Sequence, residues 1–451
     1  MTTQEVFKKQ RAFFDTGKTF DVFFRLEQLK KLKQSVLDCA QDLVVAFKTD
    51  YNKCEFDVYS TEVGIVIKEL DYFLKNLKKL AKPKRVSTSM VNYSSYGKIV
   101  SVPLGVVLVV SPWNYPFQLT LMPVIGALAG GNTVIVKPSS KTPNVSNVIK
   151  KILSVFDEQY AYVNCERDDG LFDLPFDFMF YTGGADFAKT IRAKQAKHLI
   201  PCVLELGGKS PAIVDADADL DLSAKRIVWG KFLNAGQTCV APDYCVVHKS
   251  VKAEFVQKVL FYIKKFYYTG DALNDDYPYV ITESKAQEVI GLISKEKILC
   301  GGTAEGRKMP PTVLDNVTFD SPIMQSEIFA PVLPILTFDV LTELLAKLKT
   351  MDRPLAFYYF STSLSACDFV AQNTLSGGGC INDTVMHLTE EKLPFGGLGA
   401  SGYGSYHGKK SYDTFVHYKS VLVKSKTELE LKYPPYNDKK LAFVKNWFKI
   451  K

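Results

Sequence analysis

The chain has 451 residues, of which 47% are hydrophobic and 23% charged, and its formal net charge is +8. This length exceeds the size at which a single core usually stops growing, so we expect at least two domains, and the composition excludes a disordered chain. The basic residues lie at spacings typical of solvated helix faces, without an interleaved aromatic stripe, which disfavours a nucleic-acid partner.

The first eighty residues have the apolar periodicity of amphipathic helices, including a second helical block over Tyr59–Leu80. Residues Ser87–Val102 then alternate between apolar and polar side chains, which predicts extended strands. From Leu104 onward, valine-rich runs typical of parallel strands buried on both faces alternate with helical segments. The expected elements are Gly105–Ser111, Leu119–Ala129, Thr133–Lys137, Pro143–Phe156, Ala161–Cys165, Phe178–Tyr181 and a helix from Ala185.

A second block of alternating strands and helices begins near Glu205 and ends in a glycine-rich region, Ser376–Gly408. Its expected elements are Ala212–Val214, Ser223–Phe232, Asp243–Val247, Val251–Phe266, Pro331–Phe338, Leu341–Leu348 and Ala356–Ser361. The alternation predicts the α/β fold class, with parallel sheets in two interleaved domains. Ligands of such sheets bind beyond the carboxyl ends of the strands. The candidates directly after apolar runs are Pro112–Asn114, Lys137–Ser139 and Thr182–Gly184.

The nine cysteines lie at irregular spacings and form no CxxC pair, so we expect neither a disulfide framework nor a metal site. Met1–Arg11 lacks the apolar core of a signal peptide, and the apolar run Val102–Val110 is too short to span a bilayer. We therefore expect no membrane span and a cytoplasmic location, where free thiols persist.

Cys239 lies in a loop of small and polar residues, Asn234–Pro242, which would leave its sulfur accessible to a ligand. A lone cysteine is nevertheless more often a structural thiol. Glu205 follows the apolar run Cys202–Leu204 and is either a general base or a helix N-terminal charge. Gly183-Gly184-Ala185 either presents backbone N–H groups to a phosphate or forms a tight turn. The GxGxxG and P-loop fingerprints are absent from the first sheet.

Six motifs, in one order, resemble those of the aldehyde dehydrogenase superfamily. They are Ser111–Pro116, Val136–Ser139, Leu204–Pro211, Gly236–Cys239, Gln325–Pro331 and Leu393–Gly402. The resemblance extends from about Val102 to Lys419. The short chain and the segments Ala241–Tyr244 and Tyr406–Phe415 are similar to the class 3 branch, which oxidises fatty and aromatic aldehydes.

The resemblance implies the aldehyde dehydrogenase fold, with a Rossmann-like cofactor-binding domain, an α/β catalytic domain and a small oligomerisation arm. The implied bounds are 1–82 and 99–205 for the dinucleotide-binding domain, 206–400 for the catalytic domain, 83–98 and 401–425 for the arm, and 426–451 for a C-terminal tail. It also implies a homodimer, and the strand-like segments Ser87–Val102 and Ser420–Lys424 are the expected pairing elements.

The implied reaction is the NAD- or NADP-dependent oxidation of a small-molecule aldehyde, medium- or long-chain aliphatic or aromatic, to its carboxylic acid. Cys239 would attack as a thiolate, giving a thiohemiacetal and then a thioester. The Asn114 amide and the Cys239 backbone N–H would hold the oxyanion. Glu205 is the expected base for thioester hydrolysis, with Glu327 as its competitor.

The resemblance also assigns binding roles, in which Lys137 and Glu327 contact the two riboses of the cofactor and Phe329 packs near the nicotinamide. Without the motifs, Lys137 could equally be a surface lysine and Phe395 a core residue. The cofactor set is Trp113, Lys137, Ser140, Thr182, Gly183, Gly184, Leu206, Glu327 and Phe329; the substrate cleft set is Tyr115, Phe395 and His407.

Two departures from the family pattern concern the cofactor. The phosphate-side turn Gly183–Ala188 lacks both the usual hydroxyl and the closing glycine, so backbone N–H groups would carry that contact. Ser140 occupies the position where many NAD-using members have an acid, and a carboxylate there would repel a 2′-phosphate. We therefore predict that NADP is accepted at least as well as NAD.

Two alternatives remain open from the sequence. A semialdehyde dehydrogenase would need a cation near the substrate mouth, and no such residue can be identified. A non-catalytic relative acting as a binding protein would be marked by loss of Cys239, Glu205 or Asn114, and all of these residues are present.

Overall fold

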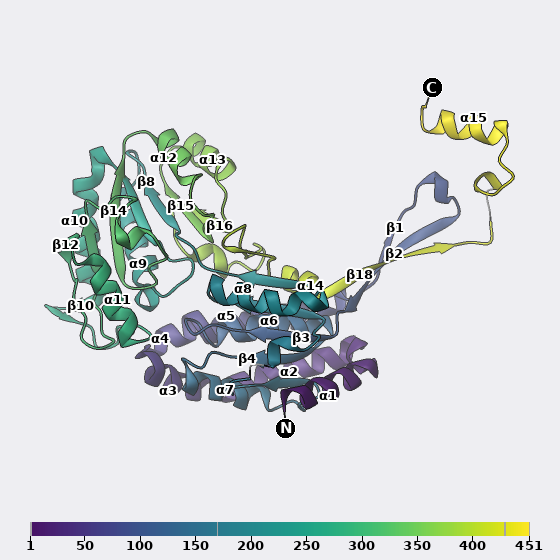
Figure 1. The fold of residues 1–451 in the computed structure, drawn as a ribbon, viewed down its shortest axis with the longest axis horizontal. Helices are drawn as coiled ribbons and strands as arrows, with labels where there is room; N and C mark the ends of the chain where they lie inside the picture. Colours follow the sequence, from purple (N-terminus) through teal and green to yellow (C-terminus); the bar gives the residue numbers. More distant parts are fainter. Residues whose placement is uncertain (1, 169, 428–429, 451) are drawn as a thin grey trace.

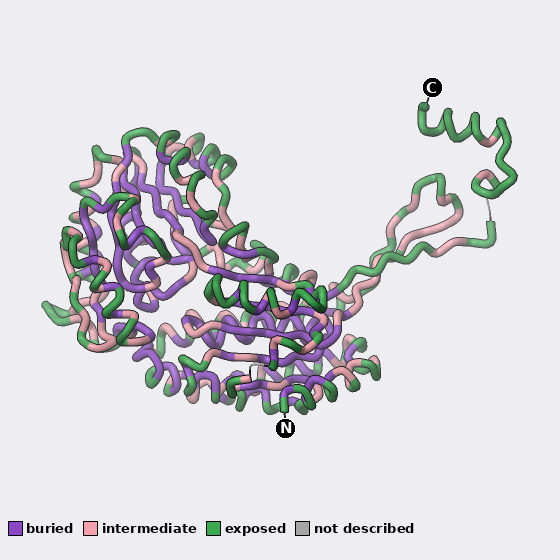
Figure 2. Tube along the Cα trace, in the orientation of Figure 1, coloured by how far each residue is buried: buried purple, intermediate pink, exposed green. Residues whose placement is uncertain are grey.

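The computed structural model describes residues 2–168, 170–427 and 430–450. Two α/β lobes lie against each other, and a long arm carries the C-terminal helix away from both (Figure 1). Buried residues concentrate inside the two lobes, whereas the arm is exposed or half-buried along most of its length (Figure 2). The expected α/β class is confirmed.

The first lobe contains a six-stranded sheet in the order β17-β7-β6-β3-β4-β5. Its parallel strands are β3 (Val106–Val110), β4 (Thr133–Lys137), β5 (Ala161–Val163), β6 (Phe178–Thr182) and β7 (Cys202–Glu205). All residues of β3 and β6 are buried, because helices cover both faces of the sheet. The short strand β17 (Gly402–Tyr403) pairs antiparallel with β7, so these two residues extend the first sheet and not the arm.

Helices from the first 153 residues pack on this sheet and on one another. The helix α6 (Gln118–Gly130) is buried along its whole length. The other helices of this lobe are α1 (Thr3–Asp15), α2 (Val22–Asp38), α3 (Ala40–Tyr51), α4 (Glu55–Val58), the π-helical turn η2 (Tyr59–Val63), α5 (Gly64–Leu80), α7 (Pro143–Leu153) and α8 (Ala185–Gln195).

The second lobe contains a seven-stranded sheet in the order β12-β13-β14-β9-β8-β15-β16. Its strands are β8 (Pro211–Val214), β9 (Tyr244–His248), β12 (Lys297–Cys300), β13 (Thr312–Asp315), β14 (Val332–Phe338), β15 (Ala356–Phe360) and β16 (Gly378–Ile381). Only the edge strand β12 is antiparallel to its neighbour among these described strands. The helices are α9 (Leu220–Phe232), α10 (Lys252–Tyr267), α11 (Glu283–Ile293), α12 (Leu341–Leu348) and α13 (Leu364–Asn373).

The arm is a three-stranded antiparallel sheet in the order β1-β2-β18. β2 (Ser95–Pro103) pairs with β18 (Val416–Lys424) over its whole length, and β1 (Lys84–Val86) pairs with the outer part of β2. The expected extended segment Ser87–Val102 is therefore wrong in its first half, where a 3-10 turn, η3 (Met90–Asn92), interrupts the chain. The helix α15 (Asp438–Trp447) follows beyond the arm (Figure 1).

The chain passes directly from the first sheet to the second. β7 ends at Glu205, and β8 begins at Pro211 after five residues. The Leu206 N–H donates to the Ser401 carbonyl at 3.0 Å, which fixes this crossing against the glycine-rich segment. Glu205 therefore lies at the carboxyl end of a parallel strand and at the junction between the lobes, where ligands of such sheets bind.

Candidate active site

Two cavities meet at Cys239. A polar cavity of about 770 Å³ and an apolar cavity of about 380 Å³ both have Cys239 and Glu205 in their walls. Asn114 lines the polar cavity, and its amide donates to the Gln237 carbonyl at 3.1 Å. The structure therefore brings together the residues that the sequence singled out as nucleophile, base and oxyanion donor.

The loop before Cys239 is held in a conformation that few side chains tolerate. Asn234 and Ala235 have φ angles of 51° and 53°, in the left-handed region. The Asn234 amide donates to the Asn114 carbonyl at 2.9 Å, and the Gln237 side chain accepts from the Ile281 N–H at 2.8 Å. These contacts connect the loop to both lobes, so the partly accessible Cys239 thiol is held in a fixed position.

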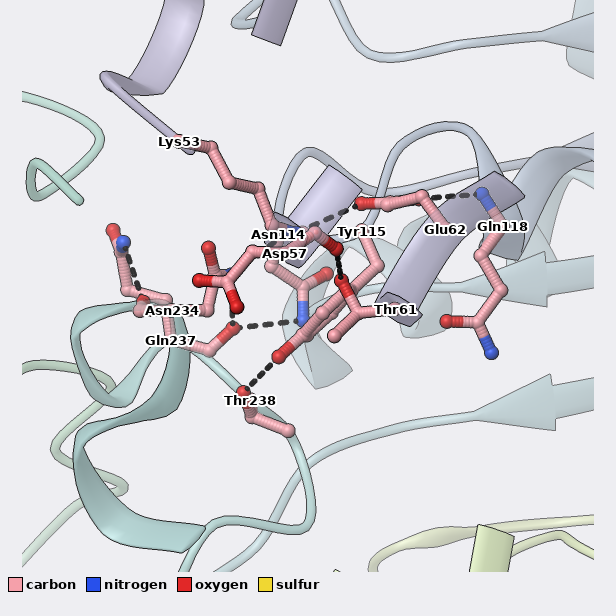
Figure 3. Close-up of polar contacts among 10 residues, drawn as sticks. All are labelled: Lys53, Asp57, Thr61, Glu62, Asn114, Tyr115, Gln118, Asn234, Gln237 and Thr238. Carbon is pink, nitrogen blue, oxygen red and sulfur yellow. Dashed lines mark hydrogen bonds and ion pairs between the residues drawn. The ribbon is translucent and has the colours of Figure 1, made fainter. Parts of the chain in front are cut away.

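A buried ion pair supports this loop from the first lobe (Figure 3). Lys53 Nζ lies 3.2 Å from a carboxyl oxygen of Glu62, and both side chains are 0% exposed. The same ammonium lies 4.4 Å from the ring centroid of Tyr115, whose hydroxyl hydrogen-bonds the Thr238 hydroxyl at 2.7 Å. The other Glu62 oxygen accepts from the Gln118 N–H at 2.7 Å, at the start of α6. Glu62 thus satisfies a backbone donor at a helix N-terminus, where an anion is favoured.

The surroundings of the Cys239 thiol favour its protonated form. Burial raises its pKa well above the ordinary value, and the carboxyl groups of Glu205 and Glu327 raise it further. Because the thiolate is the nucleophilic form, a group that takes the thiol proton is required for attack on an electrophile.

Glu205 is well suited to accept a proton. Burial raises the pKa of its carboxyl group to about 7, against the lowering effect of the neighbouring Tyr406 and Thr182 hydroxyls. Thr182 donates to one carboxyl oxygen at 3.2 Å, while the other oxygen has no hydrogen-bond partner among the described residues. One oxygen is thus oriented, and the other is a buried acceptor without a partner in the described part of the chain.

Glu327 lies on the other side of the polar cavity, against the Leu206–Ser210 crossing. A Cβ atom at Gly207 would lie 2.0 Å from a carboxyl oxygen of Glu327, so only glycine permits this contact. Burial and, to a smaller extent, the carboxylate of Asp243 raise the pKa of Glu327 to about 8, against the lowering effect of a hydrogen bond from the Gly208 N–H. Glu327 is therefore a second candidate proton acceptor in the wall of the polar cavity.

The polar cavity fits a dinucleotide. It lies beyond the carboxyl ends of β3, β6 and β7, and the N-terminus of α8 opens into it. Gly184 is the N-cap of α8, makes no side-chain cap, and has nothing within 4 Å of the position of a Cβ. The first N–H groups of this helix can therefore receive a phosphate. Trp113 and Phe329 form an aromatic wall, with ring centroids 5.4 Å apart. The predicted residues Trp113, Thr182, Gly183, Gly184, Leu206, Glu327 and Phe329 all line this cavity.

Two predicted cofactor residues lie outside the cavity wall. Lys137 ends β4, is half-buried, and donates to the Pro138 carbonyl at 3.1 Å. Burial lowers the pKa of Lys137. Ser140 is exposed in the following turn, and neither residue is among those that line the polar cavity. Lys141 connects this turn with the wall of the polar cavity, because its ammonium lies 5.6 Å from the ring centroid of Trp113.

The predicted cleft residues Tyr115, Phe395 and His407 all line the apolar cavity. The rings of Phe395 and His407 stack with centroids 5.3 Å apart. Burial lowers the pKa of His407 to about 3, so its imidazole is neutral. The wall is therefore mostly uncharged, as an apolar substrate requires.

Several residues of the site were missed by sequence reasoning. Tyr406 lines the apolar cavity beside Glu205 and begins a segment that we had singled out only for its resemblance. Gln237 belongs to a quoted motif, although its structural hydrogen bonds could not be foreseen. Lys53 and Glu62 had no local signal, because their pairing behind Tyr115 depends on how the N-terminal helices pack.

A cysteine in the walls of both a large polar cavity and an apolar cavity is the arrangement expected of an oxidoreductase that takes a dinucleotide cofactor and an apolar substrate. The sequence profile of the aldehyde dehydrogenase family matches residues 2–421. The 4,4'-diaponeurosporen-aldehyde dehydrogenase of Staphylococcus aureus is 43% identical, over 99% of this chain and 99% of its own length. "Aldehyde dehydrogenase, dimeric NADP-preferring" of Canis lupus familiaris is 39% identical, over 96% of this chain and 97% of its own length.

Among solved structures, the substrate-bound state of Staphylococcus aureus AldH has a TM-score of 0.96 at 42% identity, with 99% of this chain and 100% of that chain covered. The chain belongs to the aldehyde dehydrogenase family. The predicted family, the enzyme class and the use of NAD or NADP are thereby confirmed.

Two kinds of feature are absent from the part of the chain that the structure describes. Within residues 2–168, 170–427 and 430–450, no three His, Cys, Asp or Glu side chains are grouped so that they could hold a metal ion. In the same ranges no helix has the length and apolar character needed to cross a bilayer.

Proposed function

We propose that this aldehyde dehydrogenase oxidises medium- or long-chain aliphatic, or aromatic, aldehydes to carboxylic acids through a covalent Cys239 intermediate. The observation that carries this proposal is the position of Cys239 between a polar cavity that fits a dinucleotide and an apolar cavity that fits a hydrocarbon. One relative is named 4,4'-diaponeurosporen-aldehyde dehydrogenase, and this name is consistent with an apolar substrate.

The first step is attack of the Cys239 sulfur on the aldehyde carbon, with the thiol proton passing to a carboxylate. Glu205 is our choice for this acceptor, because its unpartnered oxygen and raised pKa of about 7 suit proton transfer near neutral pH. After the thiol proton has been released from Glu205 to solvent, the same carboxylate takes a proton from the water that hydrolyses the thioester in the later step. Glu327, with its pKa raised to about 8, is the alternative base.

The oxyanion of the thiohemiacetal needs donors that are already in place. The Asn114 amide and the Cys239 backbone N–H are the proposed pair, and each such donor is typically worth about 3 kcal/mol. Asn114 is 3% exposed and its carbonyl is bound by Asn234, so its backbone is fixed before substrate arrives.

NAD or NADP, when bound, accepts the hydride that leaves the thiohemiacetal carbon. The α8 N-terminus and Gly184 would hold the pyrophosphate, Glu327 the ribose near the nicotinamide, and Trp113 and Phe329 the ring system. Lys137 and Ser140, which lie outside the cavity wall, are proposed for the adenosine side. We propose that NADP is used at least as well as NAD, since Ser140 offers no carboxylate to repel a 2′-phosphate.

A semialdehyde is a weaker candidate substrate. The apolar cavity is lined by the carboxyl side chains of Asp57 and Glu205, and no Lys or Arg is among the described residues of its wall. A substrate carboxylate would therefore meet like charge without a compensating cation. This favours neutral aldehydes over those that carry a distal carboxylate.

We also propose that the enzyme is a cytoplasmic homodimer, assembled through the arm. β18 is an edge strand with exposed backbone and side chains, including Leu422 at 52% exposure, and such edges favour pairing with another chain. The relative from Canis lupus familiaris that is named as dimeric supports this assembly.

The test is steady-state kinetics with nonanal, benzaldehyde and succinic semialdehyde, each with NAD and with NADP, following absorbance of the reduced cofactor. We expect kcat/KM to be highest for nonanal or benzaldehyde and lowest for succinic semialdehyde. A preference for the semialdehyde would reject the proposed substrate class. A preference for NAD of about tenfold or more, which corresponds to about 1.4 kcal/mol, would reject the proposed use of Ser140.

A further inference from the structure

Glu327 lies in a segment that has no regular structure of its own. Residues 325–331 connect the 3-10 turn η8 (Pro322–Met324) to β14 without forming a helix or a strand. Phe329 in this segment has a φ angle of 51°, in the left-handed region, which a bulky residue adopts only where its surroundings impose it. The position of Glu327 in the wall of the polar cavity therefore depends on contacts from outside the segment.

Lys209 and Asp243 supply such contacts on both sides of Glu327. Lys209 Nζ donates to the Ser326 carbonyl at 2.8 Å, and a carboxylate oxygen of Asp243 accepts from the Ile328 N–H at 3.0 Å. The Ser326 carbonyl belongs to the peptide group directly before the Glu327 Cα atom, and the Ile328 N–H to the peptide group directly after it. The direction in which the Glu327 side chain leaves the backbone is thereby fixed.

The two side chains also hold each other. Lys209 Nζ lies 2.5 Å from the other carboxylate oxygen of Asp243, and the side chains are 12% and 5% exposed. Lys209 lies two residues before β8 and Asp243 directly before β9, and these strands are parallel neighbours. The Asp243 N–H donates to the Ser210 carbonyl at 2.8 Å. Because each charged group makes hydrogen bonds besides the ion pair, its desolvation is offset and the geometry of the pair is specific.

We propose that the Lys209–Asp243 pair positions the dinucleotide, by fixing the direction of the Glu327 carboxyl group. This inference rests on the proposed contact between Glu327 and the ribose near the nicotinamide. A misplacement of about 1 Å at such a contact is enough to weaken binding and slow the reaction. Asp243 is not among the described residues that line either cavity, so its contact with the site is made through the segment 325–331.

The test is fluorescence titration of the full chain with NADP, in the parent and in the variants K209M, D243N and K209M/D243N. Asparagine at position 243 replaces one of two acceptor oxygens by a donor nitrogen, so it cannot hold both Lys209 and the Ile328 N–H. We expect each single variant to raise Kd by about tenfold or more. The double variant should bind no more weakly than the weaker single variant, because the two side chains act as one unit. Losses that multiply in the double variant would contradict the proposal.

A matched control comes from another ion pair of the same lobe. Lys252 Nζ lies 2.6 Å from Asp315, the side chains are 23% and 12% exposed, and neither residue is among the described residues that line the cavities. The variant K252M should therefore bind NADP like the parent. A comparable loss of affinity in K252M would assign the effect to general destabilisation of the lobe and overturn the proposal.

The sign of the D243N effect separates positioning from net charge. NADP is an anion, so removal of the Asp243 charge alone would strengthen its binding, whereas loss of the Glu327 geometry weakens it. Tighter or unchanged binding by D243N would overturn the proposal, and D243N decides in this way even if K209M does not fold. In addition, K209M should change Kd by less than about twofold when it is introduced into E327Q, because the carboxylate that it positions is then absent. A loss as large as in the parent would overturn the proposal.

Two further measurements show that the variants keep an intact substrate side. The rate at which iodoacetamide alkylates Cys239 in the ligand-free protein, followed by peptide mass, should stay close to that of the parent. KM for benzaldehyde should also be unchanged, because neither Lys209 nor Asp243 is among the described residues that line the apolar cavity. A parent that binds NADP but oxidises no aldehyde would reject the proposed function. An active parent with unchanged Kd in K209M would overturn only the role of the pair.

Discussion

The Glu205 carboxyl group raises the pKa of the Cys239 thiol, and both side chains form part of the wall between the two cavities. A carboxylate beside a thiol disfavours the thiolate, so Glu205 makes Cys239 less nucleophilic at rest. If Glu205 accepts the thiol proton, the new thiolate faces a neutral carboxyl group and the repulsion disappears. The pair would thus keep the sulfur protected until an aldehyde is bound, and its two members can be tested separately.

Replacement of Cys239 by alanine should abolish aldehyde oxidation, because no covalent intermediate can form. Cofactor binding should remain close to that of the parent, since Cys239 is one small part of the wall of the polar cavity. Turnover with benzaldehyde and titration of NADP by fluorescence measure the two properties. C367A, at a buried thiol near Ser361, is the control and should retain activity. Retained turnover in C239A would remove the assigned nucleophile.

Glu205→Gln should slow thioester hydrolysis by about 100-fold or more and allow the acyl-enzyme to accumulate, which mass spectrometry of the quenched enzyme detects. In the parent, the carboxylate must be deprotonated to act as base. Since burial raises the pKa of Glu205 to about 7, the rate of hydrolysis should rise with pH through about 7 and level off above it. E205Q should lose this dependence.

Glu327→Gln distinguishes the competing base. If Glu327 mainly positions the cofactor, E327Q should raise KM for NADP and leave no acyl-enzyme. Accumulation of acyl-enzyme in E327Q and not in E205Q would transfer the base role to Glu327. The pH profile should then follow the higher pKa of about 8.

Removal of either charge of the Lys53–Glu62 pair should lower the free energy of unfolding substantially. Glu62→Gln or Lys53→Met leaves one buried charge without its partner, and such changes typically cost about 3–5 kcal/mol of unfolding free energy. The double variant should lose much less than the sum of the singles. Urea unfolding measures this, with E27Q at the exposed Lys31–Glu27 pair as the control, where about 0.5 kcal/mol or less is expected. Additive losses would show that the pair is not coupled.

Ser140→Asp should lower kcat/KM for NADP by about tenfold or more and leave kcat/KM for NAD unchanged or higher. The physical reason is repulsion between the new carboxylate and the 2′-phosphate, close to Lys137. S140A is the control, because it removes the hydroxyl without adding charge. An equal fall with both cofactors in S140D would indicate a general disturbance of the turn and not recognition of the ribose.

Light scattering should give twice the chain mass over a range of concentrations. Leu422→Glu introduces charge on the exposed edge strand β18 and should shift the protein toward the monomer. Leu364→Glu, at an 82% exposed position on α13 in the second lobe, should leave the mass unchanged. A parent that stays at the mass of one chain would reject the proposed arm contact.

The sequence predicted most accurately those helices and strands in which all side chains have the same surroundings, such as strands buried on both faces. The valine-rich runs became β3 and β4 because strands buried on both faces carry continuous apolar residues. The edge strand β12 was missed because its apolar run, Ile298–Cys300, is only three residues long and its residues are exposed or half-buried. The strand β13 was also missed, although it is fully buried, because it has only four residues and directly follows Pro310 and Pro311.

For the site, motifs located the segments but not their mutual contacts. Cys239, Glu205 and Asn114 come from three segments that meet only where the two lobes join, and the family pattern was needed to associate them. The buried Lys53–Glu62 pair and the exclusion of Lys137 from the cavity wall arise from tertiary packing that a single sequence does not encode locally. The assigned roles of the site residues and the domain bounds stay predictions.

Cys239 lies in the walls of two cavities that are lined by largely different residues, and this has a kinetic consequence. A carboxylic acid product can leave through the apolar opening while the reduced dinucleotide still occupies its own, so neither departure has to wait for the other. Inhibition by added acid should therefore compete with the aldehyde and not with the oxidised dinucleotide. An enzyme with separate openings for its two products can therefore release them in either order, as their dissociation rates determine.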